Sequence, residues 1–183
     1  MRYRRSDVID RALLLLDAVG LPELSMRRLG ADLGVQPSAL YHHVPNKQTL
    51  LALMADELLA RATWPEVAAW EEQVASICWT LDEVLLSWRD GAELAATAWS
   101  FGLGAQAPYD LLLTTLEEGG FGKLGPTAAR TLLHYVYGHA VDEQTHRQAA
   151  AAGAIDAGQR EDDFGTGLAM IIAGIQVVHA ARS

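Results

Sequence analysis

The sequence predicts an all-α fold, and three observations support this fold class. Apolar residues recur at spacings of three and four along most of the 183 residues, which is the period of an amphipathic helix. No segment shows the strand-like alternation of apolar and polar residues, and no internal repeat is found in the sequence. Glycine and proline stand between the apolar segments, where they end one helix before the next begins.

The first two helices are expected before residue 35. The first runs from Ser6 to Gly20 and carries an apolar stripe along one face. The second follows Ser25, whose hydroxyl can cap backbone N–H groups that have no partner in the first turn. It ends at Gly34, because glycine suits the left-handed residue that closes a helix. Both ends are therefore marked by residue type.

The third helix is short and completes a helix-turn-helix pattern. Pro37 fits the first turn of a helix, and Pro45 with the capping residue Asn46 breaks the chain again, so the helix is expected within residues 36–44. A short pair of helices with a tight glycine turn is the arrangement that lays its second helix in the major groove of DNA.

The remaining sequence also indicates helices. They are expected over residues 46–62, from Trp70 through Trp88, over 109–118, over 126–149 and from Phe164 through Val178. Trp64 and Pro65 mark a boundary after the helix expected over residues 46–62. Gly91 and the segment 102–108 interrupt the helical pattern in the middle of the chain. The small residues of 149–158 predict a mobile loop.

Composition limits the class of protein. The net charge is −9, but residues 1–48 carry +2 and the remainder carries −11, so the charge of the N-terminal part permits DNA binding. The one cysteine, Cys78, cannot form an internal disulfide, which suits a reducing cytoplasm. The apolar run Leu168–Val178 is too short to span a membrane. We therefore expect a soluble cytoplasmic protein without a membrane partner.

The third helix offers a reading face. On a helical wheel Leu40 and Val44 face inward, while the opposite side carries small, hydroxyl and imidazole side chains suited to base edges. That outward set is Ser38, Ala39, Tyr41 and His42. Arg27 and Arg28 open the preceding helix and can reach a DNA phosphate or a guanine edge. Lys47 opens the following helix, where it is placed for a phosphate. A solvent-facing helix of an ordinary bundle is the alternative.

The N-terminal block resembles the tetracycline-repressor (TetR) family of transcriptional regulators. The resemblance is carried in order by Val8–Leu13, Leu24–Gly30, Leu33–Val35, Leu40–Val44 and Asn46–Leu51. Looser similarity to the tetracycline-repressor subgroup continues in Trp88–Ala92, Tyr109–Asp110, Glu118–Phe121 and Gly138–Val141. The resemblance spans nearly the whole chain.

This resemblance implies a homodimer whose last two long helices form a four-helix bundle with those of the partner. It implies a helix-turn-helix DNA-binding domain at residues 1–47 and a helical effector-binding and dimerisation domain at 48–183, with 48–62 as the connecting helix. An effector that shifts this helix changes DNA affinity, as in a ligand-responsive repressor of palindromic operators. The family positions that face operator DNA correspond to Arg27, Pro37, Ser38, Ala39, Tyr41, His42, His43 and Lys47.

The chain departs from the tetracycline site of that subgroup. Ala95 and Thr63 align with histidines that contact the drug there, so a magnesium-chelated drug loses its direct anchor. We therefore expect a small apolar or aromatic effector instead of tetracycline. Its candidate contacts are Trp88, Trp99, Phe101, Tyr109, His134, Tyr137 and His139. Aromatic residues at helical spacing can equally belong to the core.

Two other classes of function stay open at this point. His139, Asp142 and His146 share one helix face, so they can hold a metal or respond to pH, or they can simply be polar residues at an interface. A metal-dependent enzyme would have to use this cluster. We expect no enzyme, no cofactor and no catalytic residue, because the sequence has no Gly-x-Ser-x-Gly motif, phosphate loop or cysteine-based metal spacing. A helical sensor or partner-binding protein without DNA binding is the other alternative.

Overall fold

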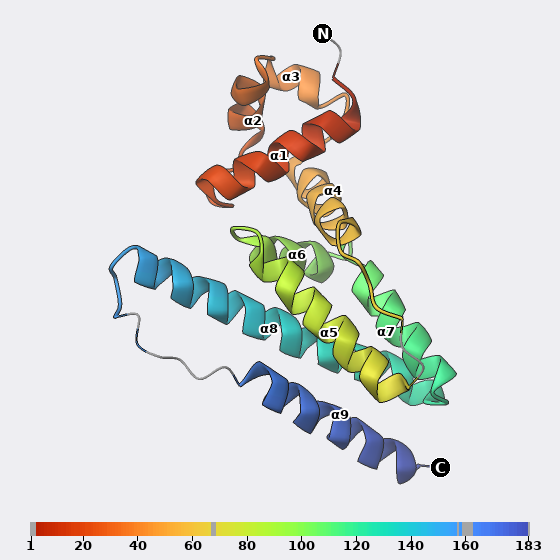
Figure 1. Ribbon diagram of the computed structural model, residues 1–183. Helices are drawn as coiled ribbons and strands as arrows, with labels where there is room; N and C mark the ends of the chain where they lie inside the picture. Colours follow the sequence, from red (N-terminus) through yellow and green to blue (C-terminus); the bar gives the residue numbers. More distant parts are fainter. Residues whose placement is uncertain (1–2, 67–68, 157, 159–162, 183) are drawn as a thin grey trace. The chain divides into compact units, whose positions relative to one another are not determined.

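The computed structural model describes residues 3–66, 69–156, 158 and 163–182, which form helices joined by turns (Figure 1). No strand occurs in these ranges, and the predicted all-α fold class is confirmed. The chain divides into two compact units. Unit 1 comprises Met1–Ala62 and Val84–Gln106, and unit 2 comprises Thr63–Glu83 and Ala107–Ser183.

Unit 1 holds the N-terminal helices. Its elements are α1 (Arg5–Val19), α2 (Met26–Leu33), α3 (Pro37–Leu40), α4 (Lys47–Ala60) and α6 (Gly91–Ser100). Helix α1 packs against α2 and α4, α2 packs against α3, and α4 packs against α6. Fully buried side chains from all of the first four helices form its core, among them Leu13, Leu16, Leu29, Leu40, Leu50 and Leu58. Burial of each such leucine contributes about 1.5–3 kcal/mol, which holds these short helices together.

The helix ends in unit 1 follow the predicted capping. The Ser25 hydroxyl accepts a hydrogen bond from the Arg28 N–H (3.2 Å), and the Asn46 side chain accepts one from the Thr49 N–H (2.7 Å). Gly34 ends α2 in the left-handed conformation, with φ 68° and ψ 28°. These local signals were sufficient to fix both boundaries of α2 and the start of α4.

Helix α3 is shorter than predicted. Its regular part covers only Pro37–Leu40, and residues 41–43 form a turn. The Val44 N–H still donates to the Leu40 carbonyl (2.9 Å), so the α-helical hydrogen bond between residues four apart is kept at this point. Leu40 and Val44 therefore point into the core as predicted, with 1% and 0% of their surface exposed.

Unit 2 is built on a long helix. Its elements are the residues of α5 (Trp70–Leu86) up to Glu83, α7 (Ala107–Glu118), a 3-10 turn η1 (Gly122–Leu124), α8 (Gly125–Ala151) and α9 (Phe164–Ala180). Helix α8 packs against both α7 and α9. An aromatic stack joins α5, η1 and α9. Trp70 in the first turn of α5 lies edge-on to Phe121, the residue before η1, with 4.7 Å between ring centroids. Phe121 in turn stacks on His179 at the end of α9, with 4.1 Å between centroids.

The start of α9 is fixed by a buried aromatic residue. Phe164 is fully buried, lies edge-on to Trp79 of α5 (4.7 Å) and stacks on Tyr135 of α8 (5.4 Å). The Tyr135 hydroxyl also donates to the Phe164 carbonyl (2.8 Å). A Cβ atom on Gly167 would lie 2.7 Å from Cζ of Tyr135, so only glycine permits this close approach.

Two sequence-based expectations for the helices need correction. Helix α6 was not predicted, since Gly91 marked a break in the pattern; Gly91 is instead its first residue, where a Cβ would lie 2.6 Å from the Leu85 carbonyl. The loop expected over residues 149–158 starts later, because α8 continues to Ala151. Residue 157 of that expected loop lies outside the described residues.

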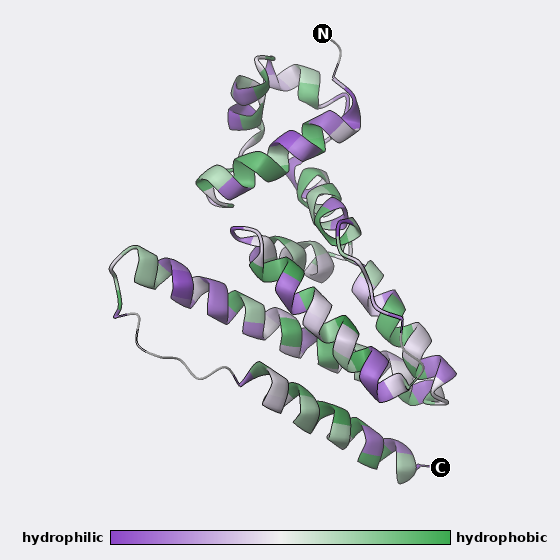
Figure 2. Ribbon diagram, viewed as in Figure 1, coloured by the Kyte–Doolittle hydropathy of each residue, from purple (hydrophilic) through white to green (hydrophobic). Residues whose placement is uncertain are grey.

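Much of the apolar surface of α9 is exposed in a single chain. The helix is coloured as hydrophobic over most of its length in Figure 2. Met170 is 70% exposed and Val177 is 68% exposed. No helix in the described part of the chain has both the length and the apolar character needed to cross a membrane.

Candidate nucleic-acid interface and effector site

The residues proposed to read DNA lie on the outside of unit 1. Ser38, Ala39, Tyr41 and His42 are exposed, whereas Pro37 and His43 are half-buried. Tyr41 has 49% of its surface exposed although it is a large aromatic residue. The inward-facing Leu40 and Val44 fix this turn of chain on the core, so the opposite side is presented as one polar surface.

The predicted phosphate contacts differ in their surroundings. Arg27 and Arg28 are both exposed in the first turn of α2. Arg28 forms an ion pair with Glu23 (2.9 Å), an exposed pair of the kind that contributes about 0–1 kcal/mol and that a phosphate can replace. Lys47 is half-buried as the first residue of α4.

A turn before α6 is bonded to the chain that follows α1. The Asp90 side chain is buried, and its Oδ2 accepts a hydrogen bond from the Leu21 N–H (2.6 Å). The neighbouring Arg89 donates its backbone N–H to Asp17 (3.2 Å) and its guanidinium to the Ala18 carbonyl (3.3 Å). These bonds join α6 to the helix-turn-helix part of unit 1, a role that sequence reasoning did not assign to Asp90.

The predicted effector contacts are divided between the two units. Trp88, Trp99 and Phe101 belong to unit 1, and Tyr109, His134, Tyr137 and His139 belong to unit 2. Phe101 and His134 are exposed, Tyr137 is buried, and the others are half-buried. The ring of Trp88 lies 5.3 Å from the guanidinium carbon of Arg61, which gives this aromatic residue a cation–π partner inside unit 1.

Tyr137 is unusual among these residues. Its side chain is 5% exposed, and its hydroxyl has no hydrogen-bond partner among the described residues. Burial raises the pKa of Tyr137 far above its usual value near 10, so the hydroxyl keeps its proton. A buried polar atom without a partner is costly, and such atoms in native proteins frequently serve a ligand or strain-bearing role.

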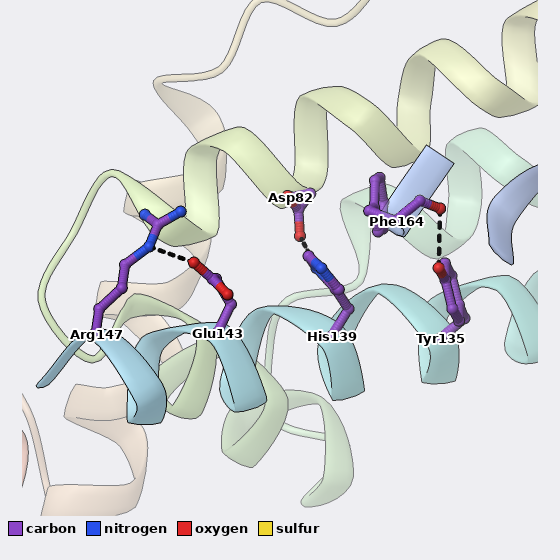
Figure 3. A network of polar contacts seen from close by, with 6 residues as sticks. All are labelled: Asp82, Tyr135, His139, Glu143, Arg147 and Phe164. Carbon is purple, nitrogen blue, oxygen red and sulfur yellow. Dashed lines mark hydrogen bonds and ion pairs between the residues drawn. The ribbon is translucent and has the colours of Figure 1, made fainter. Parts of the chain in front are cut away.

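His139 has a partner that sequence reasoning missed. Its Nδ1 lies 3.0 Å from Oδ1 of Asp82, a buried carboxylate on α5 (Figure 3). The ring of His139 also contacts Phe164 (4.7 Å between centroids). The available signal was an acidic residue within the apolar seam of α5, one residue after the buried Leu81.

A groove of about 590 Å³ lies beside this pair. Its lining comes from α8 and from Asp163 and the first turns of α9, and includes His134, Tyr135, Gly138, His139, Asp142 and Gly167. His134 and His139, both predicted effector contacts, therefore meet at one surface. The described residues contain no group of three His, Cys, Asp or Glu side chains arranged to hold a metal, so the face of His139, Asp142 and His146 offers no metal centre in these ranges.

A larger pocket in unit 2 was not anticipated. It measures about 710 Å³ and opens between the segment before α5, the start of α5 and α7. Its lining is Trp64, Glu66, Gln73, Ala107, Asp110, Leu111, Thr114, Thr115 and Glu118. None of the residues predicted to contact the effector lines it, although Tyr109 is adjacent in sequence.

Comparison with known proteins identifies the family. The family model of bacterial regulatory proteins of the tetR family matches residues 8–54, and the model of the tetracyclin repressor-like C-terminal domain matches residues 64–158. The chain belongs to the tetR family. These matches confirm the resemblance that the N-terminal block indicates. This tetR-family chain is a ligand-responsive, DNA-binding transcriptional regulator.

Relatives of this tetR-family chain extend over most of its length. Tetracycline repressor protein class D of Escherichia coli is 33% identical over 159 residues, which are 81% of this chain and 70% of that protein. BioQ of Mycobacterium smegmatis has a TM-score of 0.85 and 34% identity, covering 96% of this chain and 99% of that one. ActR of Streptomyces coelicolor, solved in complex with (S)-DNPA, has a TM-score of 0.81 and 28% identity, covering 97% and 98% of the two chains.

Proposed function

We propose that this regulator is a homodimeric repressor that binds a palindromic operator and releases it when a small apolar or aromatic effector binds. The observation that carries the DNA-binding part is the polar surface of Ser38, Tyr41 and His42, held outward by the buried Leu40 and Val44. Residues 1–47 act as the DNA-binding domain, 48–62 as the connecting helix and the rest as the effector and dimerisation domain. BioQ has been solved with its double-stranded DNA operator, which supports this assignment.

The exposed apolar surface of α9 supports dimerisation through the last two long helices. Met170, Val177 and Val178 are exposed on this helix, and several large apolar side chains exposed on one helix are typical of a protein interface. A two-fold dimer places two reading surfaces on one duplex, so that each half-site meets the same residues. The operator is therefore expected to be palindromic.

Operator selection tests the proposed function directly. The protein is incubated with random duplex DNA at moderate salt, and the bound sequences are recovered and aligned. A palindromic site with a dissociation constant of about 10⁻⁸ to 10⁻¹¹ M is expected. Failure to enrich any palindrome would contradict DNA recognition and favour a sensor or partner-binding protein without DNA binding.

His42 and Lys47 are expected to act on DNA in different ways. His42→Ala should change base preference, with a loss of about 1–3 kcal/mol at the contacted position, because the imidazole faces the groove. Lys47→Ala should weaken all sequences about equally and reduce the salt slope by about 2, because each of the two subunits loses one ammonium contact to phosphate. Titration of the selected duplex and of single-base variants measures both effects. Equal losses on every sequence for both variants would remove His42 from base recognition.

The effector is proposed to contact Tyr137 through its free hydroxyl. Because this group stays protonated, it can donate one hydrogen bond to an acceptor on an otherwise apolar molecule. Trp88, Trp99, Phe101, Tyr109, His134 and His139 are the other proposed contacts. Ala95 is fully buried and Thr63 is exposed, and neither supplies an imidazole for a metal-chelated drug. ActR has been solved in complex with (S)-DNPA, which supports a small-molecule effector for this chain.

Removal of the Tyr137 hydroxyl is expected to stabilise the ligand-free protein. Tyr137→Phe should raise the free energy of unfolding by about 1 kcal/mol, since it eliminates a buried polar atom that has no partner. Tyr135→Phe is the matched control: its hydroxyl bonds the Phe164 carbonyl, so its loss should lower stability by about 1 kcal/mol. Urea unfolding measures both. Changes of the same sign would show that the Tyr137 hydroxyl is satisfied in solution.

We also propose that this regulator is not an enzyme, uses no cofactor and works in the cytoplasm. The relatives that share its family are transcriptional regulators, which supports the absence of catalysis. Cytoplasmic location follows from the proposed contact with operator DNA. Fractionation of cells followed by immunodetection would test this location.

A further inference from the structure

The segment before α1 is fixed to the helix-turn-helix. The Tyr3 hydroxyl donates a hydrogen bond to the carbonyl of Leu33, the last residue of α2 (3.0 Å). This carbonyl is one of the four at a helix end that have no partner within the helix. Tyr3 therefore holds the start of the chain at the turn that leads into α3, only four residues before Pro37.

The backbone after Tyr3 is also ordered. The Arg4 N–H donates to Oδ2 of Asp7 (2.7 Å), which caps α1, and Arg5 is the first residue of that helix. Both arginine side chains are exposed. Two cations thus lie on a fixed backbone next to the contact between Tyr3 and α2.

The basic residues between Tyr3 and Glu66 fall into two groups. Arg11 pairs with Asp32, Arg28 pairs with Glu23, and Arg61 pairs with Asp10 and Glu57. Four other basic side chains have no ion pair within the described range 3–66, since no carboxylate oxygen there lies within 4.0 Å of them. They are Arg4, Arg5, Arg27 and Lys47. Two of these four are already proposed phosphate contacts. The remaining two, Arg4 and Arg5, are equally able to bind a phosphate, because no carboxylate in this range pairs with them.

We infer that Arg4 and Arg5 form an additional DNA contact, on the phosphates that flank the groove entered by α3, and that Tyr3 positions them. This inference rests on the proposed DNA-binding function and adds a contact that the helix-turn-helix residues do not supply. Phosphate is the ligand because it is the repeating anion of duplex DNA and because guanidinium groups bind it through paired N–H donors. Prior ordering of the segment by Tyr3 lowers the entropy lost when these arginines bind.

The salt dependence of operator binding tests the inference. The probe is the palindromic duplex recovered by selection with the wild-type protein, and affinity is measured by fluorescence anisotropy between low and high salt. Each phosphate contact contributes about 0.9 to the slope of log K against log salt. Because both subunits of the proposed dimer carry the substitutions, Arg4→Ala/Arg5→Ala removes four contacts and should reduce that slope by about 3.6. Lys123→Ala/Arg130→Ala removes two exposed cations of unit 2 and should leave the slope unchanged.

Tyr3→Phe separates positioning from charge. It removes the bond to Leu33 but keeps both arginines, so the salt slope should stay close to the wild-type value while affinity falls several-fold. Thermal unfolding of each variant checks that unit 1 is intact. A wild-type slope in Arg4→Ala/Arg5→Ala, together with a reduced slope in Lys47→Ala, would overturn the inference and leave the proposed function standing. Failure of the wild-type protein to select any duplex would overturn both.

Discussion

Asp90→Ala is expected to lower the free energy of unfolding by about 2–5 kcal/mol. The substitution removes the carboxylate that accepts the Leu21 N–H at 2.6 Å and leaves this buried donor without a partner, which costs about 1–3 kcal/mol. Asp90 also adopts a left-handed conformation with φ 56°, which alanine disfavours by about 1–2 kcal/mol relative to ordinary helical geometry. Both effects lower the stability of the variant, and the expected range is their sum.

Asp90→Asn is the matched control. Its amide oxygen can still accept the Leu21 N–H, and asparagine tolerates the left-handed region. We expect it to retain most of the stability that alanine loses. Urea unfolding followed by circular dichroism measures the three proteins. Equal losses for the alanine and asparagine variants would show that the hydrogen bond to Leu21 contributes little and that the carboxylate charge matters instead.

Alkaline pH is expected to destabilise the protein through Cys78. This thiol on α5 is fully buried, and burial raises its pKa from 9.0 to about 12. Above pH 9 the unfolded chain releases the proton while the folded chain keeps it, so the unfolded state gains stability as the pH rises. The contribution is present below pH 9 and is lost between pH 9 and 12, at about 1.4 kcal/mol for each pH unit.

Cys78→Ala should remove this part of the pH dependence. The variant starts from a lower stability at neutral pH, because it leaves a small cavity. Its free energy of unfolding should fall by about 2 kcal/mol less than that of the wild type between pH 9 and 11. Urea unfolding at both pH values gives the comparison, and Cys78→Val provides a second variant without a titrating group. Parallel decreases in all three proteins would assign the alkaline loss to other groups.

Local signals made the helix-turn-helix predictable. Ser25, Gly34 and Asn46 act through backbone groups only a few residues away, so residue type alone indicates where the helices begin and end. The inward direction of Leu40 and Val44 likewise follows from one helical step. The polar side of this turn therefore follows from the sequence alone.

Long-range contacts were not predictable in the same way. Asp82 pairs with His139 across 57 residues, and Asp90 meets Leu21 across 69 residues. Neither pairing leaves a periodic trace in the sequence. Helix α6 was not predicted because its alanine-rich sequence has few large apolar residues to mark one face. Its packing partner is α4, which lies far from it in the sequence. The environment of Tyr137 depends on tertiary burial, so sequence could nominate the residue but could not identify its unpartnered hydroxyl.

The apolar surface of α9 makes stability a function of protein concentration. If this surface is covered only in the proposed dimer, each unfolding event must also separate two chains, and mass action then links the unfolding midpoint to the amount of protein present. The melting temperature should rise with concentration for the wild type. A charged residue at the exposed Met170 would shift the balance toward monomers, which are expected to unfold at a temperature independent of dilution.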